Sequence, residues 1–150
     1  MKFSELVRLL EQNGFKLIRE KGSIRYYGKP GVDRLIRVDY HGAKEIPTGT
    51  LQCYSEGCRL EGKIRRDIVI DLKYSLVIEA TEDPTFFGFY SPDLEGFTGV
   101  GHSVEDCLYQ AKWGMEEHIE LLKEQSLPIP PKNPDPKIVI QNQEALARAS

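Results

Sequence analysis

Residues 19–31, REKGSIRYYGKPG, bring cationic and aromatic side chains together in one short stretch. Lysine and arginine neutralise phosphates, and a tyrosine ring beside guanidinium groups can stack on an unpaired base. This combination is typical of a site that binds single-stranded nucleic acid. A charged strand at a solvated sheet edge, which protects the edge against aggregation, has the same composition. These residues alone leave both interpretations open.

Cleavage of a bound RNA needs more than cations. Without a metal, it requires a base that takes the proton of the 2′-hydroxyl and an acid that protonates the leaving oxygen. Imidazole suits both roles because its reference pKa of about 6.5 lies near neutrality. The stretch has Ile24 at its centre and no histidine, and His41 follows later in the chain. We expect binding without cutting; His41 could substitute as a catalytic group, or be a turn histidine that contacts phosphate.

The candidate RNA-binding residues lie in the predicted strands and in the loop that follows them. They are Arg19, Lys21, Ser23, Arg25, Tyr26, Lys29, His41 and Lys44. The other two histidines, His102 and His118, have no acidic partners at a spacing that suggests a metal site. We therefore expect neither a metal nor a cofactor.

Hydrophobic periodicity predicts the elements that position this stretch. An amphipathic helix begins at Ser4, a preferred N-cap residue, and ends at Gly14, which suits the C′ position. Three strands follow, at 15–20, 23–28 and 34–40, and a second helix comes after the next loop. The order helix–strand–strand–strand–helix predicts a three-stranded antiparallel sheet with helices on one face. Small RNA-binding modules commonly have this arrangement.

The sequence pattern of the second half of the chain predicts another α+β unit. An alternating, β-branched strand at 68–80 is followed by a turn and a strand at 86–90, and SPDLEGFTGVG leads into a short third strand. A helix begins at an acidic capping box, Ser103 to Asp106, and places its apolar residues on one stripe. The segment KIVI at 137–140 predicts a last strand.

The net charge of the chain differs in sign between the same two units. Residues 1–66 hold 14 Lys and Arg against 8 Asp and Glu, a net +6, whereas residues 67–150 hold 6 against 15, a net −9. A basic half joined to an acidic half suggests a polyanion-binding unit tethered to one that mimics a polyanion. We predict two small α+β domains, at 1–62 and 71–140, with a linker at 63–70 and a tail at 141–150.

The segments LVRLLEQNGFKLIREKGS and VDYHGAKEIPTGTL resemble the HicA toxins, small endoribonucleases that cleave messenger RNA. The similarity covers residues 3–51 and rests on two separated motifs in the right order. It implies an αβββα fold of the dsRNA-binding type. It also places the family's catalytic histidine directly after the Gly22–Ser23 pair, where this chain has Ile24. Beyond Leu51 the sequence departs from the family's basic final helix, so the resemblance implies impaired catalysis.

Residues 71–132 resemble the HicB antitoxins through YSLVIEA, SPDLEGFTGVGHSVED and LPIPPK. This resemblance implies a partial RNase H-like domain of βββα(β) order, in which no metal-binding carboxylate cluster can be assigned. Pro92 and Gly96 suit a tight turn, whereas Asp93 and Leu94 are the expected contacts with the toxin-like part. DNA binding is not expected, because too few residues follow KIVI to form the DNA-binding domain that many HicB proteins carry.

Together these features predict a single-chain toxin–antitoxin protein. Its acidic C-terminal domain would mask a basic, catalytically impaired ribonuclease-like domain, in cis or across a homo-oligomer, and messenger RNA would bind the unmasked domain. Two alternatives stay open: a non-catalytic RNA-binding regulator, and an active messenger RNA endoribonuclease that uses His41. The amphipathic start, the lack of a long apolar run and three cysteines without CxxC spacing favour a cytoplasmic protein with no membrane partner.

Overall fold

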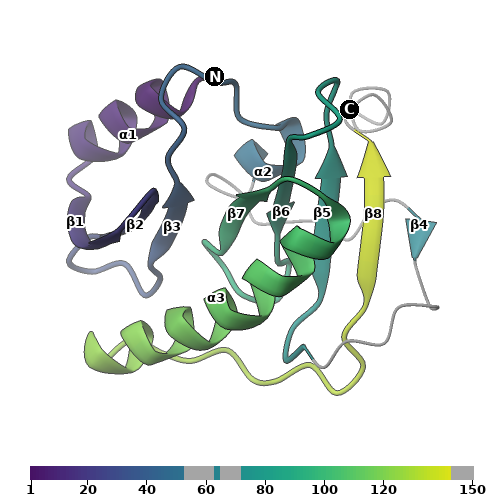
Figure 1. The fold of residues 1–150 in the computed structure, drawn as a ribbon. Helices are drawn as coiled ribbons and strands as arrows, with labels where there is room; N and C mark the ends of the chain where they lie inside the picture. Colours follow the sequence, from purple (N-terminus) through teal and green to yellow (C-terminus); the bar gives the residue numbers. More distant parts are fainter. Residues whose placement is uncertain (53–62, 65–71, 143–150) are drawn as a thin grey trace.

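The computed structural model describes residues 1–52, 63–64 and 72–142 (Figure 1). These residues form a three-stranded sheet, a five-stranded sheet and three helices, which confirms the predicted α+β class. In chain order the elements are α1 (Phe3–Gln12), β1 (Lys16–Lys21), β2 (Ile24–Gly28), β3 (Ile36–Asp39), α2 (Thr48–Gln52), β4 (Lys63–Ile64), β5 (Leu76–Ala80), β6 (Phe87–Tyr90), β7 (Thr98–Gly101), α3 (Val104–Glu124) and β8 (Ile138–Asn142). No helix in the described part of the chain is long and apolar enough to cross a membrane.

The smaller sheet contains β1, β2 and β3, paired antiparallel in that order. The apolar side of α1 packs with Tyr27, Ile36 and Val38 of this sheet. The helix ends as the sequence predicts, because Gly14 adopts a φ of +89° directly after the C-cap residue Asn13. Glycine takes this left-handed conformation without a steric cost.

The prediction that Ser4 caps α1 is wrong. Lys2 occupies the N-cap position without a side-chain hydrogen bond, and Ser4 lies inside the helix. The exposed N–H groups of the first turn find tertiary partners instead, because the N–H of Phe3 donates to the Lys44 carbonyl (3.1 Å) and that of Ser4 to the Gly42 carbonyl (2.9 Å). A loop from beyond β3 thus takes the place of a capping side chain.

The larger sheet has the strand order β4-β8-β5-β6-β7, with β5 and β8 parallel and the other neighbours antiparallel. α3 covers one face and α2 lies against the other, where Gly88 leaves room for Pro47 and Thr50. The predicted N-cap of α3 is confirmed at Ser103, whose side chain accepts a hydrogen bond from the N–H of Asp106 (3.1 Å), while the Asp106 carboxylate accepts from the N–H of His102 (2.9 Å), one residue before the cap.

Both main hydrophobic clusters combine residues from the two halves of the chain. One joins Tyr26 and Leu35 of the first half to the apolar residues of β5, β6 and α3. The other joins the apolar side of α1 to Phe86 and Val100 of the second half. The two predicted domains therefore share their cores in this fold. Most of the predicted linker, at 65–70, and most of the predicted tail, at 143–150, lie outside the described residues.

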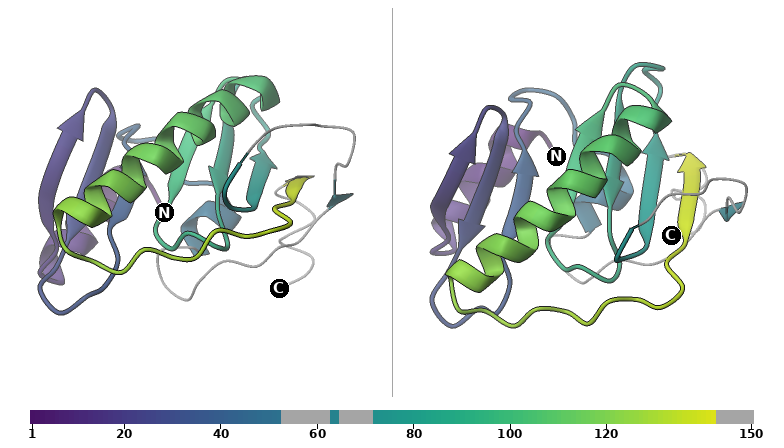
Figure 2. Two further views of the ribbon diagram at one scale, coloured as in Figure 1. Left: turned by 90° about the horizontal axis from the view of Figure 1, so that it is seen from below. Right: turned by 60° about the horizontal axis from the view of Figure 1, so that its bottom comes forward.

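The long helix α3 joins the two sheets. Its N-terminal half lies over the five-stranded sheet, and its C-terminal half runs alongside the three-stranded sheet (Figures 1 and 2). Near its C-terminal end, Glu124 forms an ion pair with Arg19 of β1 (2.8 Å). A single helix therefore contacts both sheets, and its buried residues share one hydrophobic cluster with Tyr26 of β2 and with β5 and β6.

Candidate functional site

The face of the three-stranded sheet opposite α1 is the candidate functional surface. Its side chains come from Ile24 and Tyr26 of β2 and from Leu35, Arg37 and Asp39 on and beside β3, and we call these five residues the covered face. Four of them have exposed fractions of 1–4%, and Ile24 is partly buried. A sheet face that carries an arginine and an aspartate is therefore removed from solvent by other parts of the chain.

The segment at 96–100, which leads into β7, lies directly against β3. The N–H of Arg37 donates to the Gly96 carbonyl (2.8 Å), and the hydroxyl of Thr98 donates to the Arg37 carbonyl. The N–H of Val100 donates to Asp39 Oδ2 (3.2 Å). These bonds connect strands of two different sheets, so β3 is held against the second half by main-chain and side-chain contacts together.

Arg37 is the cation at the centre of this junction. Its guanidinium donates through Nη1 to the Thr98 carbonyl, and its Cζ lies 5.0 Å from the ring centroid of Phe97 and 6.0 Å from that of Phe89. α3 has Gly114 at this place, where an added Cβ would lie 3.1 Å from Nη2 of Arg37. A carbonyl, two aromatic rings and the nearby Asp39 charge partly compensate the buried cation, whose Nε has no hydrogen-bond partner among the described residues.

Tyr26 packs into the shared core beside this arginine. Its ring is 5.5 Å from the imidazole of His118 on α3, in an edge-on arrangement, and Phe97 lies 5.8 Å from the same imidazole. Burial raises the pKa of Tyr26 to about 12. The sequence suggested that this tyrosine stacks on an RNA base. In the structure its ring is 1% exposed, because α3 covers it.

His118 is buried as a neutral imidazole. Neither ring nitrogen has a hydrogen-bond partner among the described residues. Burial, together with the nearby Arg37 cation, lowers the pKa of His118 from 6.5 to about 3. The ring therefore packs as an aromatic group between Tyr26 and Phe97, and protonation opposes the folded arrangement.

This burial predicts an acid-dependent loss of stability. Between pH 6.5 and about 3 the unfolded chain binds a proton at His118 that the folded chain rejects, so the unfolding free energy falls as pH falls, by up to about 1.4 kcal/mol per pH unit. Urea unfolding from pH 7 to pH 4.5 measures this slope, and His118→Leu should remove it. Equal slopes in the two proteins would refute the assignment, whatever the absolute stability of the variant.

The predicted RNA-binding cations remain near the surface, and several have partners within the chain. Arg19 pairs with Glu124, and Arg25 pairs with Glu20 (3.2 Å) and lies 4.0 Å from the ring centroid of Tyr40. Lys29 and Lys44 lie over phenylalanine rings, at 5.8 and 4.5 Å from the centroids, and Lys21 is exposed. Contacts of this exposed kind are weak and can be exchanged for phosphates.

A polar cluster of Ser23, Asp39 and His41 lies at the edge of the covered face. The Ser23 hydroxyl donates to Asp39 Oδ1 (2.6 Å), and His41 Nε2 lies 3.1 Å from the same oxygen. Burial favours the protonated form of Asp39, but contacts with His41 and Ser23 and the charge of Arg37 outweigh it and lower the pKa. Sequence reasoning missed Asp39, although a carboxylate in the apolar strand IRVD signals a buried partner.

The ring of His41 is held between two phenylalanines. Its centroid is 5.7 Å from that of Phe3 and 5.9 Å from that of Phe86, and its side chain is 33% exposed. Nε2 is buried beside the Asp39 carboxylate without a well-aligned hydrogen bond, so Asp39 acts on the ring through its charge, and the other nitrogen is the one that could act as a base. This geometry is compatible with proton transfer at the edge of the covered face.

The predicted interface residues Asp93 and Leu94 hold the loop of the second half together. Asp93 Oδ2 accepts from the Ser75 N–H (2.8 Å) and from Asn133 Nδ2 (2.9 Å), and Leu94 is fully buried in the shared core. Leu94 shares its cluster with Tyr26 and Leu35 of the first half, and the loop also meets the residue before β3 through Gly96, whose φ is +79° and where an added Cβ would lie 2.0 Å from the Leu35 carbonyl oxygen. The sequence indicated only a tight turn for this glycine.

A second junction joins Glu79 of β5 to the start of α2. Its carboxylate accepts hydrogen bonds from the N–H groups of Gly49 (2.7 Å) and Thr50 (3.2 Å) and from the Thr50 hydroxyl (3.3 Å). Burial raises the pKa of Glu79, although these bonds favour the ionised form. The segments GTL (49–51) and VIEA (77–80) therefore meet in the fold, which sequence reasoning did not foresee.

Comparison with known families supports the HicA-like half. The model of a family described as "HicA toxin of bacterial toxin-antitoxin" matches residues 3–54, about a third of the chain. The matched residues contain α1, the three-stranded sheet and α2. No curated protein and no solved structure matches the chain. The resemblance of the C-terminal half to the HicB antitoxins stays a prediction.

Proposed function

We propose that this chain combines a HicA-like, RNA-directed module with its own inhibitor, and that the C-terminal half covers in cis the face on which the module would bind RNA. The burial of Arg37 carries the proposal. A cation on an RNA-binding face would normally meet phosphates, yet this guanidinium is 4% exposed and contacts the Thr98 carbonyl and two phenylalanine rings of the second half.

The residue at the family's catalytic position supports the same proposal. Ile24 directly follows the Gly22–Ser23 pair and packs against the shared core. A histidine at this position would be partly desolvated and could not exchange protons freely with solvent. Loss of a general base typically reduces the rate by about 10²–10⁴-fold. A module whose active face is permanently covered does not need that base.

The acidic residues of α3 occupy the place of the missing phosphates. Glu124 pairs with Arg19, and Glu117 lies close enough to Tyr26 to favour its neutral form. The net charge is +6 for residues 1–66 and −9 for residues 67–150. An acidic half that takes the place of RNA phosphates on a basic half requires these opposite signs. RNA would therefore compete with α3 for the basic module.

The polar cluster favours a second candidate function, an endoribonuclease that uses His41. Its imidazole is partly exposed, and Asp39 lies at one nitrogen. In this mechanism His41 takes the 2′-hydroxyl proton, and Lys44, whose Nζ lies over the same Phe86 ring that His41 contacts, stabilises the charge that develops on the phosphate. Because His41 lies at the edge of the covered face, the inhibitory arrangement leaves its ring partly accessible while Asp39 stays buried.

Incubation of labelled single-stranded RNA with the full chain tests these functions. The wild-type protein and Ile24→His should both leave the RNA intact, because the new imidazole stays beneath the second half. The double variant Ile24→His/Gly96→Ala should gain cleavage, because the added methyl pushes the 96–100 segment away from β3. A double variant that is folded by circular dichroism and still inactive contradicts the masking proposal.

RNA cleavage by the wild-type chain would bear on the second candidate function, the endoribonuclease that uses His41. Cleavage that His41→Ala and Asp39→Asn each reduce at least 100-fold supports the second candidate, whereas cleavage that survives both substitutions contradicts both functions. Salt-dependent RNA binding without cleavage would support the non-catalytic regulator. In that case, reversal of the exposed cation Lys21 to glutamate should weaken binding and reduce its salt dependence.

A further inference from the structure

The outer side of α3 exposes two large aromatic residues in the middle of a charged helix. Tyr109 and Trp113 have exposed fractions of 68% and 54%, and their spacing of four residues places them on the same side of the helix. The charged residues on this side are Glu105, Lys112, Glu116, Glu120 and Lys123, all exposed. We call these seven residues the outer face of α3.

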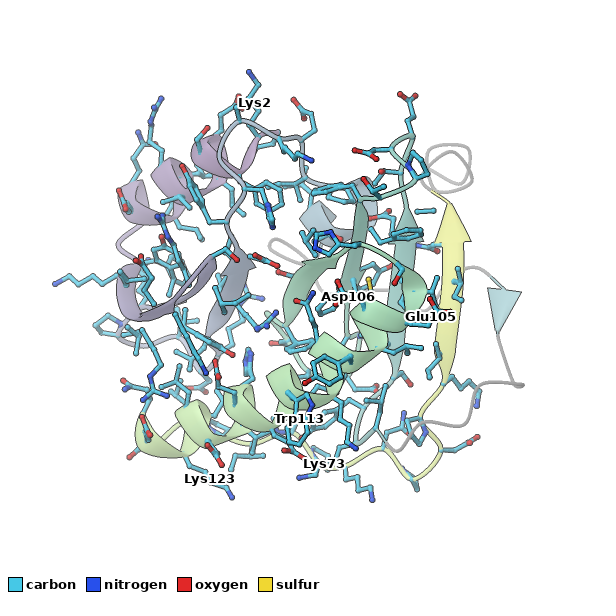
Figure 3. All side chains as sticks on the ribbon, viewed as in Figure 1. Lys2, Lys73, Glu105, Asp106, Trp113 and Lys123 are labelled. Carbon is cyan, nitrogen blue, oxygen red and sulfur yellow. The ribbon has the colours of Figure 1, made fainter. Side chains whose placement is uncertain are left out.

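This face is accessible to a partner. The opposite side of the helix, which includes Ala111, Met115 and Leu122, is buried in the shared core. Figures 1 and 2 show α3 at the surface, with none of the described elements over its outer side. Figure 3 shows Glu105 near one end of the helix, Lys123 near the other and Trp113 between them.

We propose that the outer face of α3 binds a second copy of this chain, with the two helices antiparallel about a two-fold axis at the middle of the helix. α3 runs from Val104 to Glu124, so its midpoint is Gly114. A two-fold axis at Gly114 places each residue of one helix opposite a residue of the other copy. The two residues lie the same number of positions from Gly114, on opposite sides of it in the sequence. The two Trp113 rings then lie side by side at the centre.

The charge sequence of α3 is complementary under this symmetry. Glu105 of one copy faces Lys123 of the other, since each lies nine residues from the midpoint. Lys112 faces Glu116, since each lies two residues from it. The two-fold axis repeats both pairs, which gives four oppositely charged pairs around the aromatic centre. Three glutamates on the same face oppose its use by an RNA strand.

The contact would be modest in area, because it comes from one helix pair about 30 Å long. We therefore expect a dimer whose population rises with protein concentration and falls with salt, as for a small interface with charged edges. Such a dimer does not alter the covered face, which packs against the opposite side of α3. The inference does not depend on the proposed function.

Sedimentation velocity and the fluorescence of Trp113 test the dimer together. Trp113 is the only tryptophan in the chain, so its emission should shift to shorter wavelength as the protein associates. Trp113→Ala should abolish the association. Glu105→Lys and Lys123→Glu should each raise the dissociation constant at least 10-fold, because each creates two like-charge contacts. The double variant Glu105→Lys/Lys123→Glu should restore the wild-type value, since it exchanges the partners of both pairs.

Glu95→Lys is the matched control, because it reverses an exposed charge outside α3 and should leave the dissociation constant within two-fold. A protein that is monomeric at every concentration overturns the proposal. So does a dimer that persists in Trp113→Ala, which would place the interface on another face. A double variant that associates no better than the single variants would refute the antiparallel register.

Discussion

Gly96→Ala will destabilise the protein by about 3–5 kcal/mol, an unusually large effect for the addition of one methyl group. Two causes act together at this position. The backbone has a φ of +79°, which costs a residue with a Cβ about 1–2 kcal/mol. The new Cβ would also lie 2.0 Å from the Leu35 carbonyl oxygen, and a backbone atom cannot move aside as a flexible side chain can.

Gly22→Ala is the matched control for this substitution. Gly22 has a φ of +60°, and no heavy atom lies within 4 Å of the position that its Cβ would take. It therefore carries the conformational strain without the collision, and about 1 kcal/mol is expected. Urea unfolding of both variants separates the two contributions. If Gly96→Ala costs no more than Gly22→Ala, β3 does not contact the 96–100 segment as described.

Local patterns in the sequence predicted most of the secondary structure correctly. The strands around Tyr26 and Phe89 follow from alternation, and the ends of α1 and α3 follow from Gly14 and Ser103. Each of these signals depends on neighbours within a few residues. Ser4 shows where such reasoning fails, because a loop some forty residues away supplies the carbonyls that a local cap would replace.

The sequence also contains a pattern that indicates a sheet covered on both faces. Tyr26 and Tyr27 are adjacent in β2 and so point to opposite faces, and both are about 1–2% exposed. A strand with large apolar residues on both faces indicates a sheet covered on both sides. Because Arg25 and Lys29 flank these tyrosines, the same stretch also has the composition of an exposed RNA-binding surface. The chain's own second half provides the cover.

The hydrogen-bond partners at the junctions between the two halves could not be predicted from the sequence, because tertiary packing determines them. Glu79 appears as one carboxylate in an apolar strand, and burial without hydrogen-bond donors would cost several kcal/mol. The sequence therefore indicates that Glu79 needs donors, but not which ones. They come from Gly49 and Thr50, about thirty residues earlier. The partners of Arg37 are likewise set by tertiary packing, some sixty residues away at Thr98.

Arg37→Ala will cost about 3 kcal/mol of stability, and Arg37→Met will cost less than about 1.5 kcal/mol. Both substitutions leave the Thr98 carbonyl without its guanidinium donor, and alanine in addition leaves a cavity between Phe89 and Phe97. Methionine fills much of the same volume and introduces no buried charge. Replacement of a buried ion by an apolar residue of similar size is often nearly neutral, because the desolvation penalty disappears with the ion.

The same pair of variants distinguishes a packing role for Arg37 from an electrostatic one. The Arg37 cation contributes to the low pKa of His118, so its removal in Arg37→Met should raise that pKa and move the acid-dependent loss of stability into a narrower pH range. Urea unfolding at pH 7 measures the loss of stability, and a series of unfolding curves from pH 7 down to about pH 3 measures the narrowing of that range. Equal losses for alanine and methionine would show that the charge itself holds β3 against the second half, and that packing around the guanidinium contributes little.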